Sequence, residues 1–178
     1  LLDKRVRVAK KVTHILWRLR MDKKVQKIMF SSKSDEYETP ADFFDKLQNK
    51  YHFTLDPCAT EENHKCHKYF TKEDDGLSKS WQGEKVFINP PYSKIGDWIK
   101  KAYYETRTGN SWVAMLIPAR TDTRWWHDYA MNAASIHFVK GRLKFSGAEN
   151  CAPFPSAVVI FGDLRWSPGP NIFSLARK

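Results

Sequence analysis

Short apolar runs alternate along the middle of the chain with segments whose apolar positions recur at helical spacing. Five apolar runs predict strands, at residues 53–55, 85–88, 112–117, 135–139 and 155–161. Three segments predict amphipathic helices: one that starts at Pro40 and buries Phe43, Phe44 and Leu47, then residues 95–104, and then 123–134. Thr39 would cap the first of these, with Pro40 at its first position. Strands that alternate with helices predict an α/β fold with a mainly parallel, mixed-edge sheet.

The distribution of charge divides the chain into three parts. It has 30 Lys and Arg residues against 20 Asp and Glu residues, a formal net charge of +10. Residues 1–28 hold ten basic and two acidic residues, so +8 of that charge lies there. We therefore expect a basic N-terminal arm at 1–30, a single domain at 31–165 and a C-terminal tail at 166–178. The arm is either a phosphate-contacting segment for nucleic acid or a loosely ordered terminus or upstream extension, and the sequence leaves both open.

The remaining composition excludes several classes of protein. Hydrophobic residues make up 42% of the chain and charged residues 28%, which is typical of a globular domain and argues against disorder. No apolar run reaches the roughly 18 residues of a membrane span, so we expect no membrane partner. Cys58, Cys66 and Cys151 are too few for a disulfide framework, which predicts a reducing, cytoplasmic setting. Aromatic residues make up 14%, and such rings fill cores or stack on bases.

The tetrapeptide Asn89-Pro90-Pro91-Tyr92 is the strongest candidate for chemistry. It follows the strand predicted at 85–88, so it lies at the carboxyl edge of the sheet, where open α/β folds bind ligands. Two prolines stiffen the backbone and remove two N–H donors. The Asn89 side-chain oxygen and a nearby main-chain carbonyl could accept both hydrogens of an exocyclic amino group, and the Tyr92 ring could stack on a flat heterocycle. The alternative is a rigid turn without a ligand.

Acidic residues follow in two other loops. Asp56, within Asp56-Pro57-Cys58-Ala59, ends the strand at 53–55 and could accept from the ammonium group of an amino-acid moiety, and Ala59 is small enough for close ligand approach. The turn at 74–76 carries Asp75, which could accept from a ribose hydroxyl or an adenine amino group. Each of these segments is also a common kind of surface turn, so neither is decisive alone.

Basic and aromatic residues after the strand at 112–117, and in a loop or hairpin arm at 141–145, are candidate DNA contacts: Arg120, Arg124, Trp126, Arg142 and Lys144. Arginine and lysine bind phosphates or guanine edges, and tryptophan can wedge or stack. The alternative is that Asp122 or Thr123 caps a helix over buried tryptophans and that the basic residues are solvated.

A group of cysteines and histidines lies between residues 58 and 67. Its spacing, C-x5-H-x-C-H, does not match a structural zinc pattern. We therefore expect no metal here and expect Cys58 to be a small buried residue.

Taken in order, these segments resemble the phage-type Dam family of DNA N6-adenine methyltransferases. The resemblance covers roughly residues 36–162 and is carried by residues 38–40, 53–59, 75–77, 87–92, 116–123, 126–127, 141–145 and 152–156. An ordered set of motifs is far more specific than any single one. Many methyltransferases have a glycine-rich loop after the first strand, whereas this chain has no glycine there until Gly76.

The resemblance implies a single-domain Rossmann-like fold that uses S-adenosylmethionine as methyl donor. It implies a catalytic motif at Asn89, Pro90, Pro91 and Tyr92 and a cofactor site at Thr39, Pro40, Asp56, Pro57, Ala59 and Asp75. The methyl group would go to N6 of an adenine flipped out of double-stranded DNA, in a bacterial or phage-infected cell, without a metal. We expect a monomer or a weak dimer.

Several alternatives stay open. An Asn-Pro-Pro-Tyr motif can hold any planar amino group, so the substrate could be a protein glutamine or an RNA adenine. A catalytically inactive DNA-binding module of the same fold is a further alternative. The target sequence, and whether the protein belongs to a restriction–modification pair, do not follow from the residues.

Overall fold

The computed structural model describes residues 37–108 and 110–162; the predicted arm at 1–30 and the tail at 166–178 lie outside the described residues. The elements in chain order are α2 (Ala41–Tyr51), β1 (Leu55–Asp56), β2 (Lys68–Tyr69), β3 (Lys85–Ile88), the 3-10 turn η1 (Tyr92–Lys94), α3 (Ile95–Thr108), β4 (Trp112–Pro118), α4 (Arg124–Asp128), η2 (Ala130–Asn132), β5 (Ser135–Phe138) and β6 (Ser156–Phe161). None of the helices in this described part of the chain is long and apolar enough to cross a membrane.

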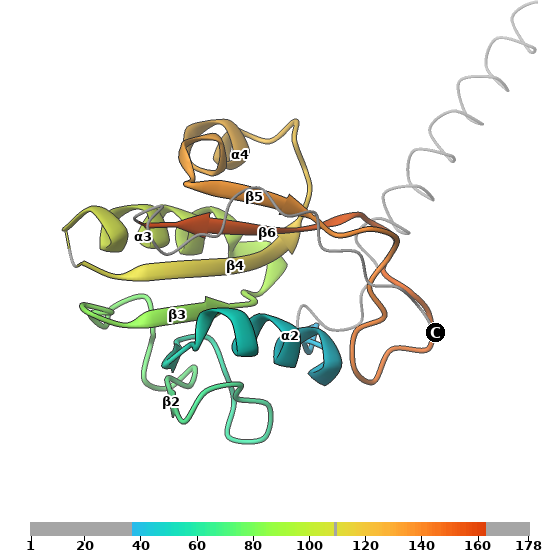
Figure 1. The fold of residues 1–178 in the computed structure, drawn as a ribbon, viewed down its shortest axis with the longest axis horizontal. Helices are drawn as coiled ribbons and strands as arrows, with labels where there is room; N and C mark the ends of the chain where they lie inside the picture. Colours follow the sequence, from blue (N-terminus) through green and yellow to red (C-terminus); the bar gives the residue numbers. More distant parts are fainter. Residues whose placement is uncertain (1–36, 109, 163–178) are drawn as a thin grey trace, which may run out of the picture. The chain divides into compact units, whose positions relative to one another are not determined.

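The six strands of the described residues form one mixed sheet in the order β2-β1-β3-β4-β6-β5 (Figure 1). Strands β2, β1, β3 and β4 pair in parallel, and β6 runs antiparallel to both β4 and β5. Five strands therefore point the same way and one is reversed, which confirms the prediction of a mainly parallel sheet. The carboxyl ends of β1, β3, β4 and β5 lie at one edge, and the loops that leave that edge carry most of the candidate residues.

Helices cover the two faces of the sheet, because successive residues of each strand point to opposite sides. From β4, Ala114 and Leu116 pack toward the α2 side, while Val113, Met115 and Ile117 pack toward α3 and α4. Helix α2 buries Phe43, Phe44, Leu47 and Tyr51 on its face of the sheet. Burial of each such side chain contributes about 1.5–3 kcal/mol.

The chain enters the sheet through a short connection. Helix α2 ends where His52 takes a left-handed conformation at φ 55°, and the His52 N–H donates to the Gln48 carbonyl. The Gln48 side chain then pairs with both main-chain groups of Phe53, at 2.8 and 3.2 Å. This clamp directs the chain into β1, so that Asp56 comes at the carboxyl edge.

Three predicted elements differ from the observed ones. Pro40 is the N-cap of α2 and the Thr39 side chain makes no capping bond, so the predicted cap is wrong by one position. The helix predicted at 123–134 is split into α4 and η2, because Tyr129 leaves the helical conformation between them. Strand β2 is an additional element, since it is not among the strands predicted from the apolar runs.

Candidate active site

A cleft of about 740 Å³ opens at the carboxyl edge of the sheet, between the loops after β1 and β3. From β1 the chain goes to β2 on one side, then crosses to β3 on the other side of β1, so the topological switch point lies between β1 and β3. Open α/β sheets bind ligands at this point. The volume lies within the range of about 300–1,000 Å³ that is usual for small-molecule sites.

Most of the residues predicted for catalysis or cofactor binding line this cleft: Thr39, Asp56, Pro57, Ala59, Asp75, Asn89 and Pro91. They come from four separate segments of the chain, so the fold brings them together. Pro40, Pro90 and Tyr92 do not line it.

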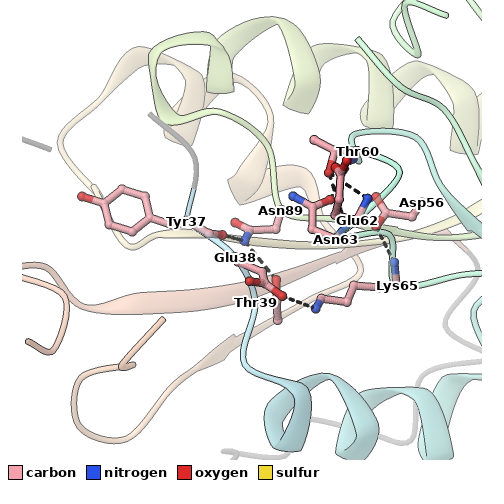
Figure 2. A network of polar contacts seen from close by, with 9 residues as sticks. All are labelled: Tyr37, Glu38, Thr39, Asp56, Thr60, Glu62, Asn63, Lys65 and Asn89. Atoms are coloured by element: carbon pink, nitrogen blue, oxygen red, sulfur yellow. Dashed lines mark hydrogen bonds and ion pairs between the residues drawn. The ribbon is translucent and has the colours of Figure 1, made fainter. Parts of the chain in front are cut away.

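The Asn89 side chain is held in one orientation by the segment before α2 (Figure 2). Its amide nitrogen donates to the main-chain carbonyl of Tyr37 and, at 2.9 Å, to the Thr39 hydroxyl. A main-chain carbonyl can only accept, so the nitrogen of the amide, not its oxygen, must face Tyr37. The Asn89 amide oxygen is buried, and no group of the described residues donates to it. An unsatisfied buried acceptor costs about 1–3 kcal/mol, which an incoming donor would relieve.

The backbone beside Asn89 adds a second acceptor. The Pro91 carbonyl accepts from the Lys94 N–H at 3.0 Å and begins η1, whereas no N–H of the described chain donates to the Pro90 carbonyl. Neither proline has an N–H of its own that could compete with a ligand's donors for these acceptors.

Asp56 is 4% exposed, and its carboxylate organises the loop after β1. One oxygen accepts from the Cys58 N–H at 3.2 Å and the other from the Lys65 N–H at 3.1 Å. Burial raises the pKa of Asp56 to about 6, an effect that these two main-chain bonds and the nearby Lys65 charge only partly offset. A cation in the cleft would favour the ionised carboxylate.

The turn at Gly76 closes against the loop that follows Asp56. A Cβ at position 76 would lie 2.0 Å from the Pro57 carbonyl oxygen, so only glycine permits this approach. On the other side, the buried Trp81 indole donates to the Gly76 carbonyl at 3.0 Å. The close backbone contact in this site is therefore made between the turn at Gly76 and the loop that follows Asp56.

The two aspartates of that turn have different tasks. Asp74 accepts from the Thr71 N–H and hydroxyl, both at 2.9 Å, and closes the turn. Asp75 has a left-handed φ of 52° and lies exposed at the rim of the cleft. Its side chain makes no hydrogen bond or ion pair within the described residues, so its carboxylate is available to a ligand.

The Tyr92 ring packs in an aromatic cluster beside the cleft. It stacks on Tyr37 with centroids 4.9 Å apart and meets Phe154 edge-on at 5.3 Å. Burial raises the pKa of the Tyr92 hydroxyl well above its usual value, which favours the neutral phenol. One face of the Tyr92 ring, which was predicted to stack on a base, is therefore covered by Tyr37.

The candidate DNA contacts divide into two groups. Arg120, Arg142 and Lys144 lie in loops that leave the same sheet edge as Asn89, and Arg124 is exposed at the start of α4. Trp126 is 2% exposed and packs in the core between α3 and the sheet, so it does not offer a surface to DNA. Trp126 is therefore a buried tryptophan, which was the alternative to a DNA contact. Thr123 precedes α4 but makes no capping bond, because its hydroxyl donates to the Arg120 carbonyl.

The cysteine and histidine loop holds no metal-like arrangement. No group of three or more His, Cys, Asp or Glu side chains within residues 37–108 and 110–162 is placed to bind a metal ion. Cys66 is the buried member and its pKa is raised to about 12 by burial, whereas Cys58 is partly exposed in the cleft, contrary to expectation.

Sequence reasoning missed two members of the site. The carbonyl of Tyr37 orients Asn89, and Lys65 forms an ion pair with Glu38 at 3.1 Å (Figure 2). The Glu38 main chain also pairs with Ser146 in the loop after β5. Segment 37–39 therefore ties three loops of the edge together. No local motif identifies it, because each of these contacts spans at least 27 positions along the chain.

Comparison with known proteins gives a consistent result. Residues 26–161 match the family described as DNA N-6-adenine-methyltransferase (Dam). The chain is 35% identical over 111 residues to a DNA N-6-adenine-methyltransferase of Escherichia phage T1, a match that covers 61% of this chain and 46% of the relative. It is 31% identical over 121 residues to a DNA N-6-adenine-methyltransferase of Haemophilus phage HP1, covering 66% of this chain and 70% of the relative. The match thus spans about half the length of the phage T1 protein.

Proposed function

We propose a function from one premise: the chain belongs to the family of DNA N-6-adenine-methyltransferases (Dam). The function is site-specific transfer of a methyl group from S-adenosylmethionine to N6 of an adenine that is flipped out of double-stranded DNA. The same premise favours a Rossmann-like, S-adenosylmethionine-dependent methyltransferase fold for the domain. The switch point between β1 and β3 supports that assignment.

The orientation of Asn89 is the observation that carries the proposal. Its amide nitrogen donates to Tyr37 and Thr39, and its oxygen is a buried acceptor that receives no hydrogen bond from residues 37–108 and 110–162. The Pro90 carbonyl, to which no main-chain N–H of the described residues donates, would be the second acceptor at this rigid corner. An exocyclic amino group has two hydrogens to donate to such a pair.

The cleft also suits the methyl donor. Asp56, a buried carboxylate in the cleft, would accept from the donor's ammonium group, and Asp75, which also lines the cleft, would accept from its ribose. Ala59 is 7% exposed and leaves room beside the Asp56 loop. When bound, S-adenosylmethionine supplies a methyl group on a positively charged sulfur, which is already a strong electrophile.

The residues of the chain act on the amino nitrogen. Adenine N6 is a poor nucleophile, because its lone pair is delocalised into the ring. Hydrogen bonds from N6 to Asn89 and Pro90 favour a pyramidal nitrogen and stabilise the positive charge that develops as its lone pair forms the new N–C bond and the C–S bond breaks. The methylated nitrogen then loses one proton to solvent. Alignment of the reacting atoms contributes up to about 7–11 kcal/mol.

DNA would approach across the carboxyl edge of the sheet. Arg120, Arg142 and Lys144 lie in loops of this edge, and Arg124 follows nearby on α4. In the loop after β5, Leu143 and Phe145 are buried while Arg142 and Lys144 between and beside them are exposed. This alternation anchors the loop and directs two cations outward, where they can contact phosphates.

Transfer of a tritiated methyl group tests the proposal. We expect label to enter duplex DNA as N6-methyladenine, and we expect Asn89→Ala to lower transfer by at least about 100-fold, the usual effect of removing a preplaced polar group. Cofactor binding should be retained. The matched control is Asn49→Ala, the same change on the exposed face of α2. Label that enters protein or RNA instead of DNA, or an Asn89→Ala variant with normal turnover, would contradict the proposal.

A further inference from the structure

Thr39, in the segment before α2, contacts the Asn89 side chain, whereas the sequence motifs assign Thr39 to the cofactor site. Thr39 is 2% exposed, and its hydroxyl accepts the Asn89 amide nitrogen at 2.9 Å. Thr39 lines the cleft, and Figure 2 shows the contact between its hydroxyl and the Asn89 amide. The resemblance to methyltransferases implies a cofactor contact at this position. The structure places the polar atom against the catalytic side chain.

The orientation of the Asn89 amide depends on two acceptors. Tyr37 supplies a main-chain carbonyl, and Thr39 supplies a hydroxyl, which can also rotate and donate. Together they take both amide hydrogens. If the Thr39 acceptor is lost, one amide hydrogen is left buried without a partner, and the amide gains freedom to turn its oxygen away from the substrate position.

Thr39 is itself held by its neighbour in the chain. Glu38 forms an ion pair with Lys65, whose main-chain N–H donates to Asp56. The Glu38 carbonyl accepts from the Ser146 N–H at 3.0 Å. The Thr39 backbone is therefore fixed between the loop after β1 and the loop after β5. A small side chain on a fixed backbone can set the direction of the Asn89 amide.

We infer that Thr39 is a positioning residue for methyl transfer: its hydroxyl fixes the Asn89 amide with the oxygen toward the target amino group. This inference rests on the proposed function, because it assumes that Asn89 accepts from the amino group that is methylated.

Two substitutions change opposite halves of the side chain. Thr39→Val keeps the volume and removes the hydroxyl; Thr39→Ser keeps the hydroxyl and removes a buried methyl group. A packing role predicts that serine is the more harmful change. A positioning role predicts that valine lowers single-turnover methyl transfer about tenfold at saturating cofactor and DNA, while serine stays within about twofold of the natural protein.

The measurements are single-turnover methyl transfer to duplex DNA, the dissociation constant of S-adenosylmethionine, and the melting temperature. We expect an unchanged dissociation constant in both variants. We also expect Thr39→Val to have no further effect in an Asn89→Ala background, because the two residues act as one unit. Normal turnover in Thr39→Val, or a tenfold weaker cofactor affinity with turnover retained, would overturn the inference.

Two controls separate this inference from the function it rests on. If the natural protein transfers no methyl group to DNA, or if Asn89→Ala keeps full activity, the proposed function fails. If Asn89→Ala is inactive and Thr39→Val is normal, only the role of Thr39 fails. Should valine prevent folding, Thr39→Ser decides alone: a tenfold loss of turnover at unchanged cofactor affinity contradicts the inference.

Discussion

Replacement of Gly76 by alanine tests whether the cleft depends on the close approach of its two loops. The new Cβ would lie 2.0 Å from the Pro57 carbonyl oxygen, whereas ordinary contacts begin at 3.4 Å. The loops would therefore have to separate by roughly 1.4 Å, the difference between these two distances. The turn cannot simply retreat, because the Gly76 carbonyl accepts from the buried Trp81 indole. Overpacking of this kind costs about 1–3 kcal/mol, and loss of the buried hydrogen bond costs a similar amount.

We expect the free energy of unfolding to fall by about 2–3 kcal/mol, and the melting temperature to fall by about 5–10 °C for a domain of this size. Affinity for S-adenosylmethionine should fall as well, because Pro57 moves together with the Asp56 loop. Thermal and urea unfolding of the two purified proteins measure the first effect, and equilibrium dialysis measures the second.

Gly96 provides a matched control in the same assay. It lies in the first turn of α3, and a Cβ there meets nothing within 4 Å. Alanine at position 96 should raise stability by about 0.5–1 kcal/mol, because glycine is the poorer helix former. A Gly76→Ala protein as stable as the natural one, with unchanged cofactor affinity, would refute the argument.

Two further predictions concern Asp56 and the basic loop after β5. Because burial raises the pKa of Asp56 to about 6, and because a cationic ligand binds the ionised form, affinity for S-adenosylmethionine should rise as pH increases from 5 to about 7 and then level off. A pH-independent affinity, measured by calorimetry, would exclude the pairing. Replacement of both Arg142 and Lys144 by alanine should reduce the salt dependence of DNA binding by about two phosphate contacts and leave the melting temperature unchanged, since both side chains are exposed. Anisotropy measured over a range of salt concentrations, with Lys100→Ala as control, decides this; an unchanged slope would place the DNA elsewhere.

Much of the fold follows from local patterns in the sequence. The strand at 85–88 and the buried face of α2 are confirmed, because a continuous apolar run and apolar residues at helical spacing both indicate which side chains are buried. The position of Asn89 at the sheet edge follows directly from the strand before it. Strand β2 could not be predicted in the same way, since its two residues are polar and pair only because β1 lies beside them.

The candidate site is less predictable where its contacts are long-range. Thr39 carries the signal of a helix cap, but its hydroxyl is used by Asn89, which lies 50 positions away. Trp126 sits in a segment rich in charge and is buried all the same, because α4 turns that face toward the sheet. Charge density describes a segment as a whole, whereas the direction of one side chain depends on what packs against it.

The contact between Tyr37 and Asn89 affects how substitutions at residue 37 should be interpreted. Its link to Asn89 is made by a peptide carbonyl, a group that all twenty amino acids carry. A library randomised at residue 37 would keep this carbonyl in every folded member, so a loss of activity there would report on the ring that stacks on Tyr92 and not on the contact with Asn89. Residues 37 and 39 thus both orient the same amide, and only at residue 39 does a side-chain substitution remove the contact itself.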